Sequence, residues 1–350
     1  MMICSLVWGQ TIKIPVDAVS LEYNDYFRKA YAGVGSYDQH YPNTLIQMNP
    51  YNGTVERQLR LNSEPGILKT TPDKKYMYLS FQSVPGILKI NLTTFMADDT
   101  IDTGGAVVVD FDVVPTSQND LVVVRDDDPN PSVCLYKNGF LMPEQIRAGY
   151  DTPSKICIKS DGTKIFGTSS SGDGWIMNIV STGIQYDSIK WDDILSTSGE
   201  IKLHNDLIYT RLGQLLDAFS DSIPKLVANM PIYNFLFVYC AGVEYSPIHG
   251  CFLFGHKTNN SAYISFFDGQ SFNYCGSLDV DNNCDAVHDV TVVDNDDFIL
   301  RSYDDENQMC LLFHHAATKD RIFLDGRNDR KKWENDGVIK SRDSSSKKHL

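Results

Sequence analysis

Apolar and polar positions along the chain follow a short unit that recurs through most of its length. Each copy has an apolar strand, a polar tight turn, and a second strand rich in β-branched and aromatic side chains, which together predict a β-hairpin. The clearest copies pair residues 19–23 with 29–34, 67–71 with 76–81, 111–114 with 121–124, and 156–159 with 164–167. Further copies turn at His204, Pro247 and Asp294.

The turns of these hairpins are regularly spaced. They fall at residues 24, 72, 115, 160, 204, 247 and 294, so that successive turns lie 43 to 48 residues apart. Third and fourth strands also occur within a copy, for example 45–48 and 55–61. A four-stranded unit repeated about every 40–45 residues is typical of a β-propeller blade. The pattern therefore predicts an all-β propeller, in which stacked sheets bury one another's faces.

The ends of the repeat bear on the number of blades. Residues 10–16 precede the first innermost strand as residues 57–61 precede the second, so we expect the N-terminal strand to complete the last blade and remove its free edge. Seven hairpins favour seven blades. A weak further copy at 332–339 leaves eight as the alternative, although it is highly charged for a central strand.

The two termini differ from this body. Residues 1–10 contain a short apolar run, 3–8, with no basic residue before it, which is either the remnant of a signal peptide or a buried first strand. We expect one propeller domain over 11–325. Residues 326–350 carry eight Lys or Arg and four Asp or Glu, and form either a basic polar tail or an incomplete last blade.

Composition excludes several classes of protein. Of 350 residues, 42% are hydrophobic and 22% charged, as in chains that bury a core, and not as in disordered or collagen-like chains. No apolar run reaches the length of about 18 residues needed for a membrane-spanning helix. The net charge of -14 argues against nucleic acid as a partner, because such proteins neutralise phosphates with Lys and Arg.

Some turn motifs resemble those of the YVTN-type bacterial β-propellers. The segment Asn49-Pro50-Tyr51-Asn52-Gly53-Thr54 is similar to their Asp-Pro-x-Thr-Gly-Thr turn, and Ser160-Asp161-Gly162-Thr163-Lys164 to their Ser-Pro-Asp-Gly-Lys element. The chain departs from them at Asn49 and at Lys74, which stands where the turn glycine belongs. The resemblance is good over 18–100, recognisable at 150–170 and thin afterwards. It implies a periplasmic, cell-surface or secreted protein, with a cytoplasmic location as the alternative, and carries no active-site residue.

Two hypotheses of function come from different classes. The first is a non-enzymatic binding or scaffold protein of the bacterial envelope or exterior, whose loops over the channel bind a protein, peptide or glycan. The loop residues that we expect to contact this partner are Tyr37, His40, Tyr41, Asp126, Asp127, Asp128, Tyr303 and Asp304. The second is a lactonase-like hydrolase or lyase acting at the channel through His288, Arg125 and Arg301. Ion pairs with neighbouring aspartates are the structural alternative for the two arginines.

Metal, cofactor and disulfide signals are weak. Asp279, Asp281, Asn283 and Asp285 place oxygen ligands at alternate positions, as calcium loops do, but the turn glycine and the bidentate glutamate are absent. A solvated loop between blades is the alternative, and we predict no cofactor. The eight cysteines include no CxxC pair, which argues against a zinc site. We expect most of them to be free, with Cys275 and Cys284 as the best candidate pair.

Overall fold

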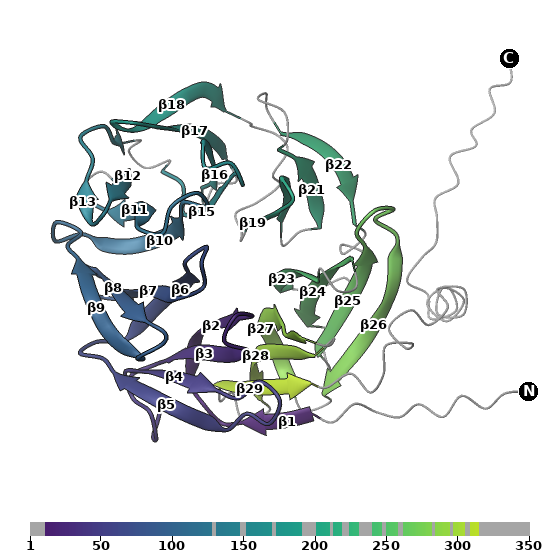
Figure 1. Cartoon of the computed structure of the whole chain (residues 1–350). Helices are drawn as coiled ribbons and strands as arrows, with labels where there is room; N and C mark the ends of the chain where they lie inside the picture. Colours follow the sequence, from purple (N-terminus) through teal and green to yellow (C-terminus); the bar gives the residue numbers. More distant parts are fainter. Residues whose placement is uncertain are drawn as a thin grey trace, which may run out of the picture.

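Seven antiparallel sheets stand in a ring around a central hub in the computed structural model of the chain (Figure 1). The structure describes residues 11–127, 131–147, 152–169, 173–190, 201–210, 213–218, 224–230, 240–246, 250–257, 262–281, 284–294, 297–304 and 309–314. These residues form strands and turns without an α-helix, and none of them belongs to a helix long and apolar enough to cross a bilayer. The prediction of an all-β propeller with seven blades is confirmed.

Each blade is a meander of four strands counted from the hub outward, except that the outermost strand of blade 3 is split into two short strands that both pair with the third strand. Blades 1 and 2 contain β2 (Ala18–Asn24), β3 (Lys29–Val34), β4 (Thr44–Met48) and β5 (Val55–Arg60), then β6 (Pro65–Thr70), β7 (Tyr76–Phe81), β8 (Ile87–Asn91) and β9 (Met96–Ile101). Blades 3 and 4 contain β10 (Val107–Val113), β11 (Asp120–Asp126), β12 (Ser132–Lys137), β13 (Phe140–Leu141) and β14 (Ile146–Arg147), then β15 (Lys155–Ile158), β16 (Lys164–Thr168), β17 (Gly174–Val180) and β18 (Gly183–Lys190).

The remaining three blades follow the same order. Blade 5 contains β19 (Ile201–His204), β20 (Leu207–Thr210), β21 (Gln214–Asp217) and β22 (Lys225–Asn229), and blade 6 contains β23 (Cys240–Ser246), β24 (Cys251–Lys257), β25 (Ala262–Asp268) and β26 (Tyr274–Asp281). Blade 7 joins the two ends of the chain: β27 (Cys284–Val292), β28 (Phe298–Asp304) and β29 (Met309–His314) are completed by β1 (Thr11–Ile14).

The ring is closed by β1 and β29. The two strands pair antiparallel from Thr11 opposite His314 to Ile14 opposite Leu311. The Oγ1 of Thr11 also lies 3.1 Å from the Nδ1 of His314. The predicted closure by the N-terminal strand is therefore confirmed, because β1 pairs with the outer edge of β29 and forms the outermost strand of the last blade.

The hydrophobic core lies between neighbouring blades. Strand β4 is buried at all five positions, because its sheet has another blade on each face, whereas five of the six residues of the outermost strand β9 are exposed. Blades 7 and 1 pack through Ala32, Ile46 and Phe313, all fully buried. This layered packing explains why the middle strands of a blade, such as β3 and β4, are buried on both faces.

The turns show why the motif residues recur. Gly162 adopts a left-handed backbone with φ +72°, which glycine reaches without steric cost. Lys74 takes the same conformation with φ 62°, although lysine pays a penalty of about 1 kcal/mol there. Its carbonyl accepts a hydrogen bond of 2.7 Å from the Nδ2 of Asn24 in the preceding blade. The turn that departs from the family motif is thus held by its neighbour.

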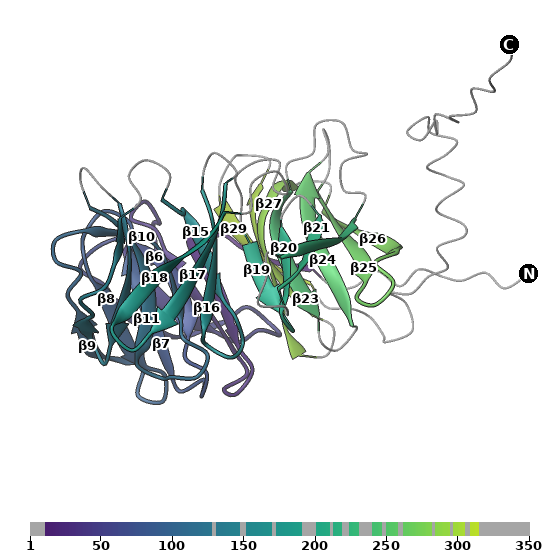
Figure 2. The same cartoon turned by 90° about the horizontal axis from the view of Figure 1, so that it is seen from above.

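The two faces of the ring carry different connections. In an antiparallel meander the links between blades and the loops between second and third strands emerge on one face, which we call the upper face. The first-to-second and third-to-fourth turns emerge on the opposite, lower face. Figure 2 shows the ring edge-on. The described residues among those predicted to bind a partner belong to the upper face.

Candidate functional site

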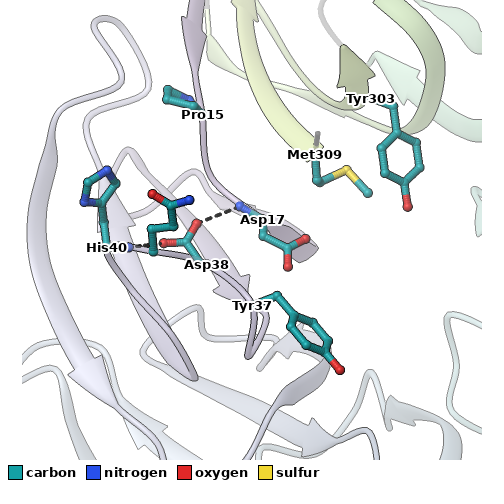
Figure 3. A pocket seen from close by; sticks show the side chains of 8 residues that line it. Pro15, Asp17, Tyr37, Asp38, His40, Tyr303 and Met309 are labelled. Carbon is teal, nitrogen blue, oxygen red and sulfur yellow. Dashed lines mark hydrogen bonds between the residues drawn. The ribbon is translucent and has the colours of Figure 1, made fainter. Parts of the chain in front are cut away.

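A pocket with a volume of about 340 Å³ opens on the upper face where blades 7 and 1 meet (Figure 3). Its wall comes from the link between β1 and β2, the β3–β4 loop, the end of β28 and the start of β29. We call it the seam pocket; it is lined by Pro15, Asp17, Tyr37, Asp38, Gln39, His40, Tyr303 and Met309. Both ends of the chain therefore contribute to one cavity, at the point where the ring closes.

Asp38 holds this wall in shape. Its Oδ2 accepts a hydrogen bond of 2.9 Å from the backbone N–H of Asp17, and its Oδ1 accepts bonds of 2.8 and 2.7 Å from His40 and Tyr41 (Figure 3). The residue is buried. Hydrogen bonds to an ionised carboxylate are stronger than neutral ones, so Asp38 fixes the β3–β4 loop against the link that closes the ring.

The carboxylate of Asp17 differs from that of Asp38 in its hydrogen bonding. It points into the seam pocket, and among the described residues nothing hydrogen-bonds or ion-pairs to it (Figure 3). Partial burial raises the pKa of this carboxyl above its ordinary value, and the negative charges of Asp38 and Glu64 raise it further. The positive charge of Arg301 acts in the opposite direction, with the smallest effect of these groups. The pocket therefore holds a carboxylate whose charge the protein itself leaves poorly compensated.

Aromatic side chains flank this carboxylate. The side chain of Tyr37 is 90% exposed, far more than is usual for an aromatic residue. The ring of Tyr303 packs edge-on against His288, with ring centroids 4.8 Å apart. Burial and the nearby Arg301 lower the pKa of His288. The predicted contact residues Tyr37, His40 and Tyr303 thus come together in one pocket, with His288 and Arg301 close behind Tyr303. Tyr41 does not line it and packs on the core between blades 7 and 1.

Arg125 lies elsewhere on the upper face, in blade 3. Its guanidinium is buried and donates to Asp127 at 2.8 Å, to the carbonyl of Thr103 at 3.1 Å and to the hydroxyl of Tyr136 at 3.1 Å. Ser132 and Gln145 accept further bonds. We call these residues the Arg125 cluster. The Asp127 carboxylate is thus hydrogen-bonded and ion-paired within this cluster, whereas the neighbouring Asp126 is exposed to solvent. The structure does not bring Arg125 together with His288 and Arg301, which belong to blade 7.

Several other predictions fall outside the described residues. Asp128 and Asn283 are not described, nor are the side chains of Asp279, Asp281, Asp285 and Asp304. The calcium site therefore stays a prediction. Within the described part of the chain, no group of three or more His, Cys, Asp or Glu could hold a metal ion. Cys134, Cys157 and Cys275 are free, so the candidate pairing of Cys275 with Cys284 is wrong.

The sequence analysis missed a set of charged residues at the hub. They occupy equivalent heights on the innermost strands, and we call them the hub charges: Glu22, Lys69, Asp112, Lys202 and Glu244. Lys69 lies 3.8 Å from Asp112, and Lys202 lies 3.1 Å from Glu244. Burial raises the pKa of Glu22 and of Asp112. The missed signal was a charged residue at the same height in each of these five innermost strands.

The fold and the closed ring define the chain as a seven-bladed β-propeller. No family model and no curated protein matches the sequence, so the YVTN resemblance stays a prediction. Among solved structures, the chain is similar to the Cps50 (Swd1) β-propeller domain of Myceliophteria thermophila, with a TM-score of 0.64 and 11% sequence identity, over 88% of this chain and 100% of that one. In all, 1466 solved chains match. At such low identity, and with so many matches, the likeness shows the fold and does not select a function.

Proposed function

We propose that this chain is a non-enzymatic binding propeller that docks a protein, peptide or glycan on its upper face, with the seam pocket at the centre of the interface. The observation that carries the proposal is the seam pocket itself, where an exposed tyrosine stands beside a carboxylate that no described residue pairs with. Tyrosine is enriched in interfaces because its ring offers a large contact area and its hydroxyl a hydrogen bond.

The contrast with the rest of the upper face supports this assignment. In the Arg125 cluster every charged group has partners within the protein, as expected of groups that stabilise the fold. In the seam pocket Asp17 and Tyr37 contribute little to packing. Residues retained in a cavity at a cost in folding free energy are typical of binding sites.

Two further parts of the proposal come from the sequence. The resemblance of the turn motifs supports a bacterial periplasmic, cell-surface or secreted location. The net charge of -14 supports a partner that is not a nucleic acid, and we propose that binding needs no cofactor.

The proposal can be tested by screening the purified chain on peptide and glycan arrays and by measuring the affinity of each hit. We expect Tyr37→Ala to weaken binding by about tenfold or more, as for a residue at the centre of an interface. The matched control is Tyr26→Ala, because Tyr26 is also exposed (62%) but lies in the β2–β3 turn on the lower face. Hits that lose affinity equally in both variants, or in neither, would contradict a docking site at the seam pocket.

A further inference from the structure

We infer that the seam pocket accepts a cationic side chain, that of a lysine or arginine in a partner peptide, and that Asp17 is its ion-pair partner. The inference rests on the proposed function and names the ligand chemistry of the same site. Three independent properties of the pocket lead to it: an unpaired carboxylate, a negative local field, and flanking rings that suit a cation.

The first property is the state of Asp17. Its neighbour Asp38 uses both carboxylate oxygens to accept backbone N–H groups, whereas the Asp17 carboxylate accepts no hydrogen bond from the described residues. The Asp17 carbonyl and N–H are both engaged, the carbonyl accepting from Gly35 at 2.8 Å. The backbone is therefore fixed while the charged group is left open to the pocket. Partial desolvation of an unpaired charge is unfavourable, and a bound cation offsets that cost.

The second property is the sign of the field. Asp38 and Glu64 are the acidic groups that act on Asp17, and Arg301 is the cationic group that does so. The Oε2 of Glu64 accepts a hydrogen bond of 2.8 Å from Ser36, which is neutral and leaves the negative charge in place. A cationic ligand is attracted into such a pocket and an acidic one is repelled, which also steers encounter with basic peptides.

The third property is the shape and chemistry of the wall. Tyr37 and Tyr303 offer aromatic rings whose faces attract an ammonium or guanidinium group. Met309 adds an apolar, adaptable surface for the methylene stem of such a side chain. A volume of about 340 Å³ accommodates one long side chain with its flanking backbone, at the lower end of ligand pockets.

A ligand bound in the seam pocket should also stabilise the closed ring. Asp17 and Tyr37 come from the first blade, and Tyr303 and Met309 from the last, so one ligand side chain contacts both sides of the seam. A ligand that binds only the closed ring stabilises it by mass action. We therefore expect saturating peptide to raise the thermal unfolding temperature.

The test uses short Gly/Ser peptides that differ at one central position, which is Arg, Lys, Gln or Glu, with affinities measured by calorimetry on the full chain. We expect the Arg and Lys peptides to bind about tenfold or more tightly than the Gln peptide, and the Glu peptide to bind weakest. Asp17→Asn removes this preference. The matched control Asp25→Asn deletes the same charge from an exposed lower-face turn and keeps the preference.

The outcomes separate the inference from the proposed function. Equal binding of the Arg and Gln peptides, or equal loss in Asp17→Asn and Asp25→Asn, overturns the cation pocket. If array hits then depend on Tyr37 and not on Asp17, the docking face stands with another ligand class. Hits that depend on neither residue overturn both. Tyr37→Leu serves as a second variant, because an exposed residue of a loop can be changed without loss of the fold.

Discussion

The Arg125 cluster and the seam pocket lie on the same face of the ring and use the same kinds of residues. Each has an arginine from the second strand of its blade, acidic residues from neighbouring loops, and a tyrosine. Arg125 is buried and hydrogen-bonds to five residues. Beside the seam pocket the Nε of Arg301 is buried without a hydrogen-bond partner, and in the pocket the Asp17 carboxylate is unpaired among the described residues. Hydrogen-bond saturation, and not residue type, distinguishes a structural cluster from a binding site here.

The cause of the difference is the connectivity of the two blades. In blade 3 the outermost strand is split into β13 and β14, and the chain between them returns Gln145 toward Arg125. Glu144 meanwhile bridges to Gly183 of blade 4. At the seam, the wall is assembled from both ends of the chain, and the backbone of Asp17 is held by the Asp38 carboxylate and by the N–H of Gly35, while its side chain receives no partner from the described residues. Arg125 in blade 3 therefore gains additional hydrogen-bond partners, whereas Asp17 at the seam faces an open cavity.

The strongest test of the comparison is Arg125→Met. Removing the guanidinium leaves the Asp127 carboxylate without its ion-pair partner and Gln145 without its strongest donor, so we expect a loss of about 3 kcal/mol in the free energy of unfolding. Arg301→Met is the matched variant, and its loss should be under about 1 kcal/mol because fewer bonds are broken. Chemical denaturation measures both. Equal losses would show that the two arginines are equivalent.

The second test concerns the anchor of the pocket. Asp38→Ala removes the acceptor of three backbone N–H groups, and we expect a loss of about 2 kcal/mol together with loss of peptide binding. Asp126→Ala deletes an exposed loop carboxylate and should change stability by no more than about 0.5 kcal/mol. Unchanged peptide binding in Asp38→Ala would contradict the role assigned to this loop.

The third test asks whether the hub charges are compensated by partners within the fold, as in the Arg125 cluster, or left poorly compensated, as Asp17 is in the seam pocket. Burial raises the pKa of Glu22, so the folded chain binds a proton more readily than the unfolded chain, and stability falls as pH rises through this range. Glu22→Gln keeps the bond from Thr70 and removes the charge. We expect it to stabilise the protein at neutral pH by at most about 1 kcal/mol and to lose this advantage in acid. If Glu22→Gln instead destabilises the protein at neutral pH, the Glu22 charge is compensated by partners within the fold.

The smallest expected effect on stability is that of Asp17→Asn. The pKa of Asp17 is raised in the folded protein, so the ionised form costs stability at neutral pH, and the variant should be slightly more stable there and equal to the parent in acid. Binding of the Arg peptide should tighten as pH rises through the pKa of Asp17, in the parent only. A less stable variant at neutral pH would mean that Asp17 already has a partner in the fold.

The fold could be predicted in detail because its signals are local. Alternation within strands and polar turns every 43 to 48 residues fix the blades, and the lone strand at the N-terminus gives the closure, which β1 and β29 confirm. The choice of seven blades over eight followed from the charge of residues 332–339, since a central strand excludes charged side chains on both faces.

The candidate site could be predicted only in part. Tyr37, His40 and Tyr303 were identified because they lie in loops of the upper face, and they do meet in one pocket. Asp17 was missed because it stands in a link between strands, with nothing in its local sequence to set it apart. The hub charges were missed because they come from five different strands and their pairing is visible only around the ring.

The amino-acid sequence by itself determined the repeat, the class of fold and the way in which the ring closes. These depend on periods of two residues and of one blade, and both can be counted along the chain. Only the tertiary structure decided which charges are neutralised, as for Arg125, and which face an open cavity, as for Asp17. The partners of a charge come from blades far apart in sequence, and the free energy of a buried charge depends on those partners rather than on its neighbours along the chain.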